Sequence, residues 1–330
     1  MTSRRGCLVG LCAWVAGAPF AARAQPAPRL RRIGFLTGNS RAEAEAYLGV
    51  LRRELAKLGW TDGQNFVFLE PRAVAGQNER LPQLALEVVA EDPELILVIS
   101  VPATRAAMQA TKSTPIVMAG VGNPVEVGLV DSYSKPGGNV TGVVLLSDEL
   151  MRKTLQLLKE TLPGVRSVAL FANPTNPQAA AMTLQVRSDA SRLGLGLQVL
   201  EVSRPDHFDD AFAAIARQGS ESLLLPPEPL ILTHSGKIGS FAESRRLPLF
   251  MAATRRWLPP GGLLSFGPSY EGMARGTARY VDRILKGARP ADLPIEQPVK
   301  FDLVVNLKAA RTLGLTIPKT VLVQADEIRE

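Results

Sequence analysis

Short apolar runs alternate with longer amphipathic segments along most of the chain. The runs Arg32–Thr37 and Leu95–Ser100 are rich in apolar residues, which is typical of strands buried on both faces of a parallel sheet. Residues 41–58 instead repeat apolar side chains at helical spacing and end before Gly59, a typical helix-terminating residue. This alternation predicts an α/β fold with helices on both faces of each sheet.

The alternation occurs in two sets of similar size, which meet at about residues 143–149. In the second set, one continuous helix is predicted at 229–246. The C-terminal part adds a helix at about 269–286, a Pro-rich connection at 290–298 and a strand near Phe301–Asn306. It is too short for a third domain, so we expect it to cross back between two lobes. The expected division is residues 25–146 plus about 268–300 for lobe 1, and residues 147–267 plus about 301–330 for lobe 2.

Polar and small residues follow six of the predicted strands, all at the same end. In open α/β sheets, ligands bind beyond the carboxyl ends of the parallel strands, so two facing lobes place a site in the cleft between them. Plain turns and helix caps use the same residue types, so a single loop does not indicate a site. The recurrence of these residues at the same end of six strands is what favours a cleft. The predicted ligand-binding residues are Asn39, Ser40, Ser100, Pro102, Ala103, Thr104, Gly122 and Asn123 in lobe 1, and Asn173, Asn176, Pro227, Glu228 and Thr254 in lobe 2.

The sequence carries no motif for catalysis. Gly120 and Gly122 follow a strand, but position 125 is Val, so the dinucleotide-binding pattern G-x-G-x-x-G fails. The two histidines, His207 and His234, lack the sequence context of a catalytic triad or a zinc protease. We therefore expect no catalytic residue, no metal and no cofactor. A hydrolase using His207 or His234 remains an alternative.

Residues 1–24 are typical of an export signal. Arg4 and Arg5 precede an apolar stretch, and Ala22-Arg23-Ala24 supplies the small residues that signal peptidase requires. Cleavage after Ala24 predicts a periplasmic protein. The alternative is a transmembrane anchor, but the apolar stretch is shorter than the ~20 residues that a bilayer requires.

Removal of this segment changes the composition. Both cysteines, Cys7 and Cys12, lie in it, so residues 25–330 contain no thiol, which suits an oxidising compartment. The Lys+Arg count falls from 38 to 35 against 31 Asp+Glu, and the formal net charge falls from +7 to +4. The basic residues are scattered among acidic ones, which argues against nucleic acid as a partner.

Several segments together form a specific pattern. They are Lys57–Asn65, Thr114–Val117, Gly122–Val125, Lys135–Gly142, Tyr280–Gly287, Ala291–Pro298 and Leu313–Pro318. The chain resembles, over essentially its whole length, a bacterial family of exported substrate-binding proteins of ABC transporters, some of whose members take tryptophan or tyrosine. The end of the predicted signal also resembles that of the family.

The resemblance implies a type I periplasmic-binding-protein fold, in which two doubly wound parallel-sheet lobes enclose a ligand cleft and are joined by three hinge crossings. Three departures from the family lie at predicted edges of this cleft. Asn123 stands where the family usually has Asp, and Ser100-Val101-Pro102 stands where it has Gly-Thr-Pro. Pro226-Pro227-Glu228 replaces a loop that is often rich in Ser and Asp, so the ligand does not transfer from any relative.

The sequence thus predicts a soluble exported receptor of an ABC uptake transporter rather than an enzyme. The expected ligand is an amino acid, an aromatic compound or another small carboxylate, bound by hinge closure and delivered to the permease subunits. We expect a monomer that meets the membrane only through the permease. One alternative is a receptor module for a signalling partner. A sugar-repressor-like regulator shares this fold, but it would need a helix-turn-helix where this chain has the predicted signal.

Overall fold

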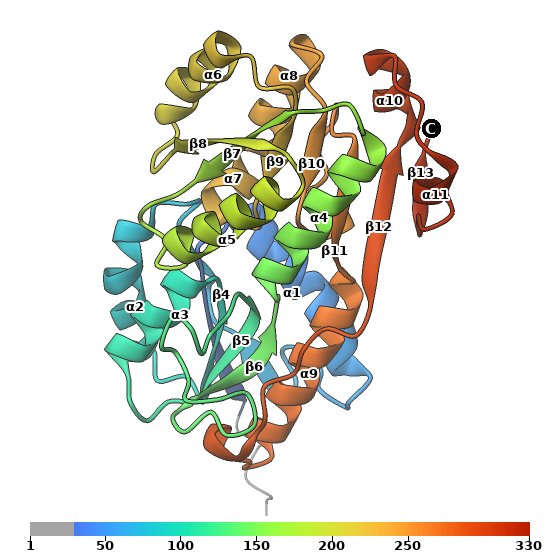
Figure 1. The fold of residues 1–330 in the computed structure, drawn as a ribbon. Helices are drawn as coiled ribbons and strands as arrows, with labels where there is room; N and C mark the ends of the chain where they lie inside the picture. The colour runs from blue at the N-terminus through green and yellow to red at the C-terminus, as the bar shows by residue number, and fades with distance from the viewer. Residues whose placement is uncertain (1–29) are drawn as a thin grey trace, which may run out of the picture.

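Two α/β lobes, each built on its own sheet, lie one above the other in Figure 1. The structure is a computed structural model that describes residues 30–330. The predicted export signal, residues 1–24, lies outside the described residues. Both sheets are mainly parallel and carry helices on both faces, which confirms the predicted fold class.

The sheet of lobe 1 has six strands. Its elements are β1 (Arg31–Thr37), α1 (Arg41–Ala56), β2 (Phe66–Phe68), β3 (Arg72–Ala73), the 3₁₀ turn η1 (Asn78–Arg80), α2 (Leu81–Ala90), β4 (Leu95–Ile99), α3 (Val101–Ala110), β5 (Ile116–Val121), β6 (Val140–Val144) and α9 (Tyr270–Leu285). The strand order is β2-β1-β4-β5-β6, β3 pairs with β1, and every pair is parallel.

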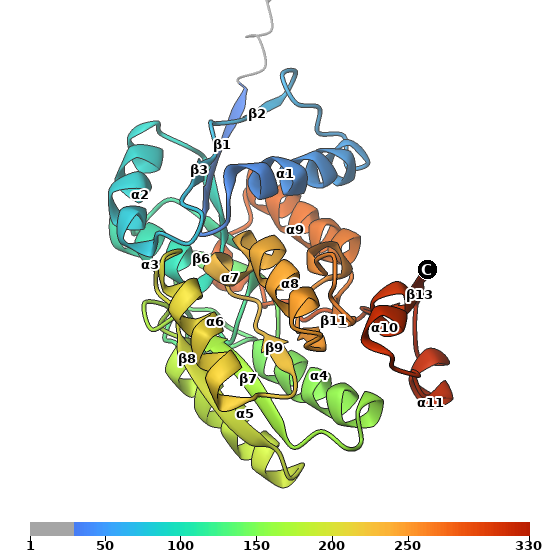
Figure 2. The same ribbon diagram turned by 90° about the horizontal axis from the view of Figure 1, so that it is seen from above.

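Side chains of β4 show why this strand has a continuous apolar sequence. Leu95 and Leu97 belong to the core under α1 and α9, whereas Ile96 and Val98 belong to the core under α2 and α3. Successive side chains of a strand point to opposite faces, so burial on both faces demands apolar residues at every position. Figure 2 shows α1 and α9 side by side on one of these faces.

The sheet of lobe 2 has seven strands, ordered β13-β12-β11-β10-β9-β7-β8. Its elements are α4 (Ser147–Thr161), β7 (Ser167–Ala172), α5 (Ala179–Arg192), β8 (Gly196–Glu201), α6 (His207–Gln218), β9 (Leu223–Leu225), α7 (Pro229–Thr233), α8 (Ser235–Ser244), β10 (Leu249–Met251), η2 (Arg255–Trp257), β11 (Leu264–Pro268), β12 (Phe301–Asn306), α10 (Leu307–Leu313), α11 (Lys319–Leu322) and β13 (Glu327–Arg329). The 3₁₀ turn η3 (Pro290–Asp292) follows α9 and packs on β6, so it belongs to lobe 1. Helices α4 and α5 cover one face, and α6, α7 and α8 cover the other.

The chain passes between the lobes three times. It crosses from β6 to α4, from β11 to α9, and from Glu296, which bridges to Val143 in lobe 1, to β12. One pair in lobe 2 departs from a parallel sheet, because β12 is antiparallel to β11. Strand β11 runs towards lobe 1, so the returning strand β12 must run away from it.

The helix predicted at 229–246 is wrong in one respect. The structure has two helices there, α7 and α8, which meet at His234 with φ −101° and ψ 12°. The backbone hydrogen bonds continue across the break, since His234 N donates to Leu230 O and Ile238 N donates to His234 O. The apolar periodicity therefore passes through the bend and does not reveal it. Within residues 30–330, no helix combines the length and hydrophobicity needed to cross a membrane.

Candidate functional site

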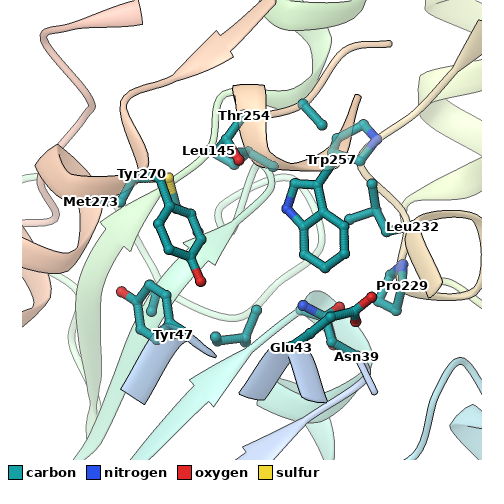
Figure 3. Close-up of a pocket in the computed structure, with 16 residues that line it drawn as sticks. Asn39, Glu43, Tyr47, Leu145, Pro229, Leu232, Thr254, Trp257, Tyr270 and Met273 are labelled. Carbon is teal, nitrogen blue, oxygen red and sulfur yellow. The ribbon is translucent and has the colours of Figure 1, made fainter. Parts of the chain in front are cut away.

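A cavity lies between the two lobes, beyond the carboxyl ends of β1, β4 and β5 on one side and of β9 and β10 on the other (Figure 3). Its volume is about 70 Å³ as space open to the centre of a water molecule, which is room for several waters. Lobe 1 contributes Asn39, Glu43, Tyr47, Ile99, Ser100, Ala119, Gly120, Tyr270 and Met273. Lobe 2 and the first crossing contribute Leu145, Pro227, Pro229, Leu232, Ala253, Thr254 and Trp257.

Aromatic rings form two walls of this cavity. Tyr47 and Tyr270 meet edge to face, with ring centroids 5.6 Å apart and an interplanar angle of 84°. Trp257 faces them from lobe 2 across the cavity in Figure 3. The Tyr47 hydroxyl donates to Thr277 Oγ1 at 2.8 Å, and Thr277 Oγ1 donates to Met273 O at 3.0 Å. These bonds fix the ring of Tyr47 and leave its flat surface to the cavity.

Glu43 brings a carboxylate to the edge of the cavity. It is the third residue of α1 and forms a capping box with Ser40, whose backbone N–H donates to Glu43 Oε2 at 2.8 Å. Thr233 Oγ1 of lobe 2 donates to the same oxygen at 3.4 Å. Burial raises the pKa of Glu43, and the hydrogen bonds from Ser40 and Thr233 offset part of that rise.

Thr254 contributes a buried hydroxyl. Its Oγ1 has no hydrogen-bond partner within the described part of the chain, and the residue is 5% exposed. Such a group costs free energy unless a water or a ligand bonds to it. Thr254 and Trp257 lie at the two ends of one short turn after β10, so this turn presents both a hydrogen-bonding group and an aromatic ring.

The lobes touch each other around the cavity. Asn78 Nδ2 of lobe 1 donates to Thr175 Oγ1 of lobe 2 at 3.0 Å. A Cβ atom added to Gly76 would lie 2.6 Å from the backbone of Leu230, so α7 of lobe 2 rests directly on this glycine. The structure therefore shows the two lobes closed on each other.

Four of the residues predicted from strand ends line this cavity: Asn39, Ser100, Pro227 and Thr254. Asn39 follows β1, Ser100 caps α3 after β4, Pro227 follows β9 and Thr254 follows β10. They come together because the carboxyl ends of the parallel strands of both sheets face the gap between the lobes.

Three other predicted residues lie in a smaller pocket within lobe 2: Asn173, Asn176 and Glu228, which share it with Pro227. Asn173 Nδ2 donates to Glu228 Oε1 at 2.9 Å, and Glu228 Oε2 accepts the backbone N–H of Ile231 at 3.2 Å. Burial raises the pKa of Glu228 to about 7, against the lowering effect of these hydrogen bonds. Glu228 therefore caps α7 and does not line the main cavity.

The remaining predicted residues lie outside the main cavity. Ser40 caps α1, Pro102 borders an outer groove next to Asn78, and Ala103 and Thr104 are fully buried in α3, where the Thr104 hydroxyl bonds to Ser100 O. Gly122 and Asn123 lie at the meeting of the lobes. The backbone of Gly122 faces the side chain of Gln178, and Asn123 donates to Asp148 and to Glu126.

The sequence reasoning missed most of the cavity wall: Glu43, Tyr47, Trp257, Tyr270 and Met273 all line it. One signal was present for Glu43, because Ser40-x-x-Glu43 has the spacing of a capping box after a strand. No local signal marks the aromatic residues, since Tyr47 and Tyr270 are separated by more than two hundred positions and meet through the packing of α1 on α9.

The two histidines lie away from the cavity. His207 Nδ1 is 3.4 Å from both the N and the Oγ of Ser203, at the start of α6. The centroid of the His234 ring lies 5.4 Å from that of the Phe208 ring, and burial lowers the pKa of His234. Neither is among the residues that line the cavity.

Similarity to known proteins extends over both lobes. The family model described as ABC transporter substrate binding protein matches residues 33–329. A tyrosine-binding protein of Clostridioides difficile (strain R20291) is 25% identical over 279 residues, which are 83% of this chain and 79% of that protein.

Solved structures are similar along nearly the entire chain. A conserved domain protein of Vibrio cholerae has a TM-score of 0.84 and 28% identity, covering 91% of this chain and 100% of its own. An ABC domain of Streptococcus pneumonia, solved in complex with L-Trp, has a TM-score of 0.82 and 24% identity, and the match covers 91% of this chain and 99% of that one. With the family model spanning both lobes, the chain belongs to the ABC transporter substrate-binding protein family.

Proposed function

We propose that the protein is an exported receptor that encloses a small solute with a flat apolar body in the cavity between its lobes and delivers it to the permease of an ABC transporter. The observation that carries the proposal is the pair of aromatic walls, Tyr270 from lobe 1 and Trp257 from lobe 2. A flat solute between them would contact both lobes at once, which stabilises the closed arrangement by its differential affinity.

The rest of the cavity supports a binding role. Its lining is mainly apolar with a few polar groups, the usual composition of a small-molecule site. Binding and release need no reacting group, so the protein acts without catalysis. The tyrosine-binding relative supports a solute with an aromatic ring, and the predicted export signal supports a periplasmic location.

Native mass spectrometry of the purified protein, followed by a thermal-shift screen of small solutes, tests this function. A solute present at 100 times its dissociation constant adds about 2.7 kcal/mol to the free energy of unfolding. The variant Trp257→Leu should weaken binding at least about tenfold, because it removes one aromatic wall.

The matched control is Trp60→Leu. Trp60 donates Nε1 to Asp282 Oδ1 at 2.8 Å on the far side of lobe 1 and does not line the cavity. This control lowers the melting temperature but leaves the affinity for the solute unchanged. Equal affinity of the Trp257 variant and the control would place the ligand elsewhere and contradict the proposal.

A further inference from the structure

Glu43 is the single charged residue among the sixteen that line the cavity. Both of its hydrogen bonds with described residues, from Ser40 N and Thr233 Oγ1, reach the same oxygen, Oε2. The other oxygen, Oε1, accepts no hydrogen bond from the described residues, while the side chain borders the cavity. A capping box accounts for Oε2 and leaves Oε1 as an acceptor available to a solute.

The surroundings of Glu43 favour a positively charged partner. The other lining residues include Tyr47, Tyr270 and Trp257, whose ring faces attract cations, and none is Lys, Arg or His. Burial of a carboxylate among apolar groups is costly unless an opposite charge pairs with it. The raised pKa of Glu43 reflects this cost.

One cation lies near the site but outside it. Arg256 is exposed to solvent, and its guanidinium carbon is 5.7 Å from the centre of the Tyr270 ring. It lowers the pKa of Glu43 less than either Ser40 or Thr233 does, and it does not line the cavity. The described residues that line the cavity therefore include no cationic side chain that could pair with Glu43.

The helix ends that meet at the cavity offer little to a carboxylate. In α3, Pro102 has no N–H, Ala103 N donates to Ser100 Oγ and Thr104 N donates to Ser100 O. In α1, the Oγ of Ser40 already accepts the backbone N–H of Glu43. Ser40 and Ser100 thus occupy three of the backbone donors in these two first turns.

The start of α7 is occupied in the same way. Pro229 has no N–H, and the backbone N–H groups of Ile231 and Leu232 donate to the side chain and to the carbonyl of Glu228. The backbone N–H of Leu230 also hydrogen-bonds to the Glu228 carboxyl, whose pKa burial raises to about 7. A carboxylate from a solute would therefore find no free backbone donor at the start of α7.

We infer that the solute is an organic monocation, in which an ammonium group pairs with Glu43 Oε1 and an aromatic body lies between Tyr270 and Trp257, without a carboxylate. The inference rests on the proposed function and assigns its flat solute to the aromatic amines, in place of amino acids and other carboxylates. The charge on Glu43 selects this class, and the aromatic walls bind its flat part.

Calorimetric titration with matched probes at pH 7.5 tests the inference. For one aromatic body the probes are tryptamine, the neutral indole-3-ethanol and the zwitterion tryptophan; for a second they are tyramine, tyrosol and tyrosine. We expect each amine to bind at least about tenfold more tightly than both the alcohol and the amino acid. The variant Glu43→Gln should abolish the preference for the amine over the alcohol.

Two substitutions control for folding and for net charge. Gln at position 43 can still accept the Ser40 N–H, because Gln serves in a capping box as Glu does. Glu45→Gln makes the same change of charge on the same helix at an exposed residue outside the cavity, and should leave the preference unchanged.

The outcomes separate this inference from the proposed function. Tighter binding of tryptophan or tyrosine than of the amines, or an amine preference that survives Glu43→Gln, would overturn it. Failure of both amines to bind would overturn it as well. None of these results decides the proposed receptor function. That function is tested separately, by the solute found with the native protein and by the affinity of the Trp257→Leu variant.

Discussion

At the scale of single residues, the cavity combines groups that are fully satisfied with groups that are not. Tyr47 is satisfied, because its hydroxyl donates to Thr277 and that hydroxyl donates in turn to Met273 O. Thr254 Oγ1 and Glu43 Oε1 instead have no partner among the described residues. This division separates the rigid wall of the site from the groups that remain for a solute.

Replacement of Thr254 by Val tests the unsatisfied hydroxyl. Valine has nearly the same shape, so we expect the free energy of unfolding of the ligand-free protein to rise by about 1 kcal/mol, because a buried group without a partner is removed. Urea unfolding monitored by circular dichroism measures the change.

For the matched control, the expected change in the free energy of unfolding has the opposite sign. Thr104 is also buried, but its Oγ1 donates to Ser100 O at 2.8 Å. Thr104→Val should therefore lower the free energy of unfolding by about 1 kcal/mol. Similar losses for Thr254→Val and Thr104→Val would show that the Thr254 hydroxyl is hydrogen-bonded in solution.

At the scale of elements, helix α7 links the small pocket of lobe 2 to the contact between the lobes. Glu228 caps it at one end, and Leu230 rests on Gly76 of lobe 1. Changes at either contact should therefore affect how the lobes meet.

Substitution of Gly76 by Ala tests that contact. Gly76 has a φ of +87°, and its added Cβ would lie 2.6 Å from the Leu230 Cα. We expect the variant to hold the lobes apart and to weaken solute binding at least about tenfold. Affinity, together with the radius of gyration from small-angle scattering, measures the effect.

Gly59→Ala is the control, because Gly59 has a similar φ of +89° and no atom within 4 Å of the added Cβ. It introduces the same backbone strain without a steric clash between the lobes. If both variants bind the solute equally well, the contact of α7 with Gly76 does not govern closure.

The buried carboxylate of Glu228 makes stability depend on pH. Its pKa is raised to about 7 in the folded protein, so the unfolded chain ionises first as the pH rises. Below about pH 4.5, Glu228 is protonated in both the folded and the unfolded state. As the pH rises from about 4.5 to 7, the free energy of unfolding falls by on the order of 3 kcal/mol, and at higher pH it levels off.

Glu228→Gln isolates this contribution. The variant should lose that fall in stability, as measured by urea unfolding at pH 5, 6, 7 and 8. The same series on Glu243→Gln, an exposed residue of α8, should reproduce the wild-type profile. If the Glu228 variant keeps the wild-type profile, Glu228 does not titrate in this range.

Element types were predictable from the sequence to a greater degree than the site was. Periodicity located most strands and helices because burial on one or two faces leaves a mark within a few residues. It missed β3, β11, α10, α11 and β13, and it joined α7 to α8 through the bend at His234.

The rule that ligands bind beyond the carboxyl ends of parallel strands depends on topology alone, and it correctly selected Asn39, Ser100 and Thr254 as residues that line the cavity. It could not find Trp257 or Tyr270, since those side chains reach the cavity through the relative position of the two lobes. That position is set by long-range packing, which no short stretch of sequence encodes.

At the scale of the whole molecule, three chain crossings join two lobes that each have their own core. The cavity exists where the lobes face each other, and its two aromatic walls come from different lobes. Membership of the ABC transporter substrate-binding protein family and this geometry both lead to one central claim, that a solute is enclosed between the lobes.

The distance between the lobes tests that claim most directly. Leu86 in α2 and Leu184 in α5 are exposed side chains of the two lobes, and they can be replaced by spin-labelled cysteines because residues 25–330 contain no native cysteine. Double electron–electron resonance then reports the distance with and without the solute found by the screen. If a solute is enclosed between the lobes, its binding shifts the population towards the short distance of the closed structure. An unchanged distance distribution at saturating solute would contradict enclosure.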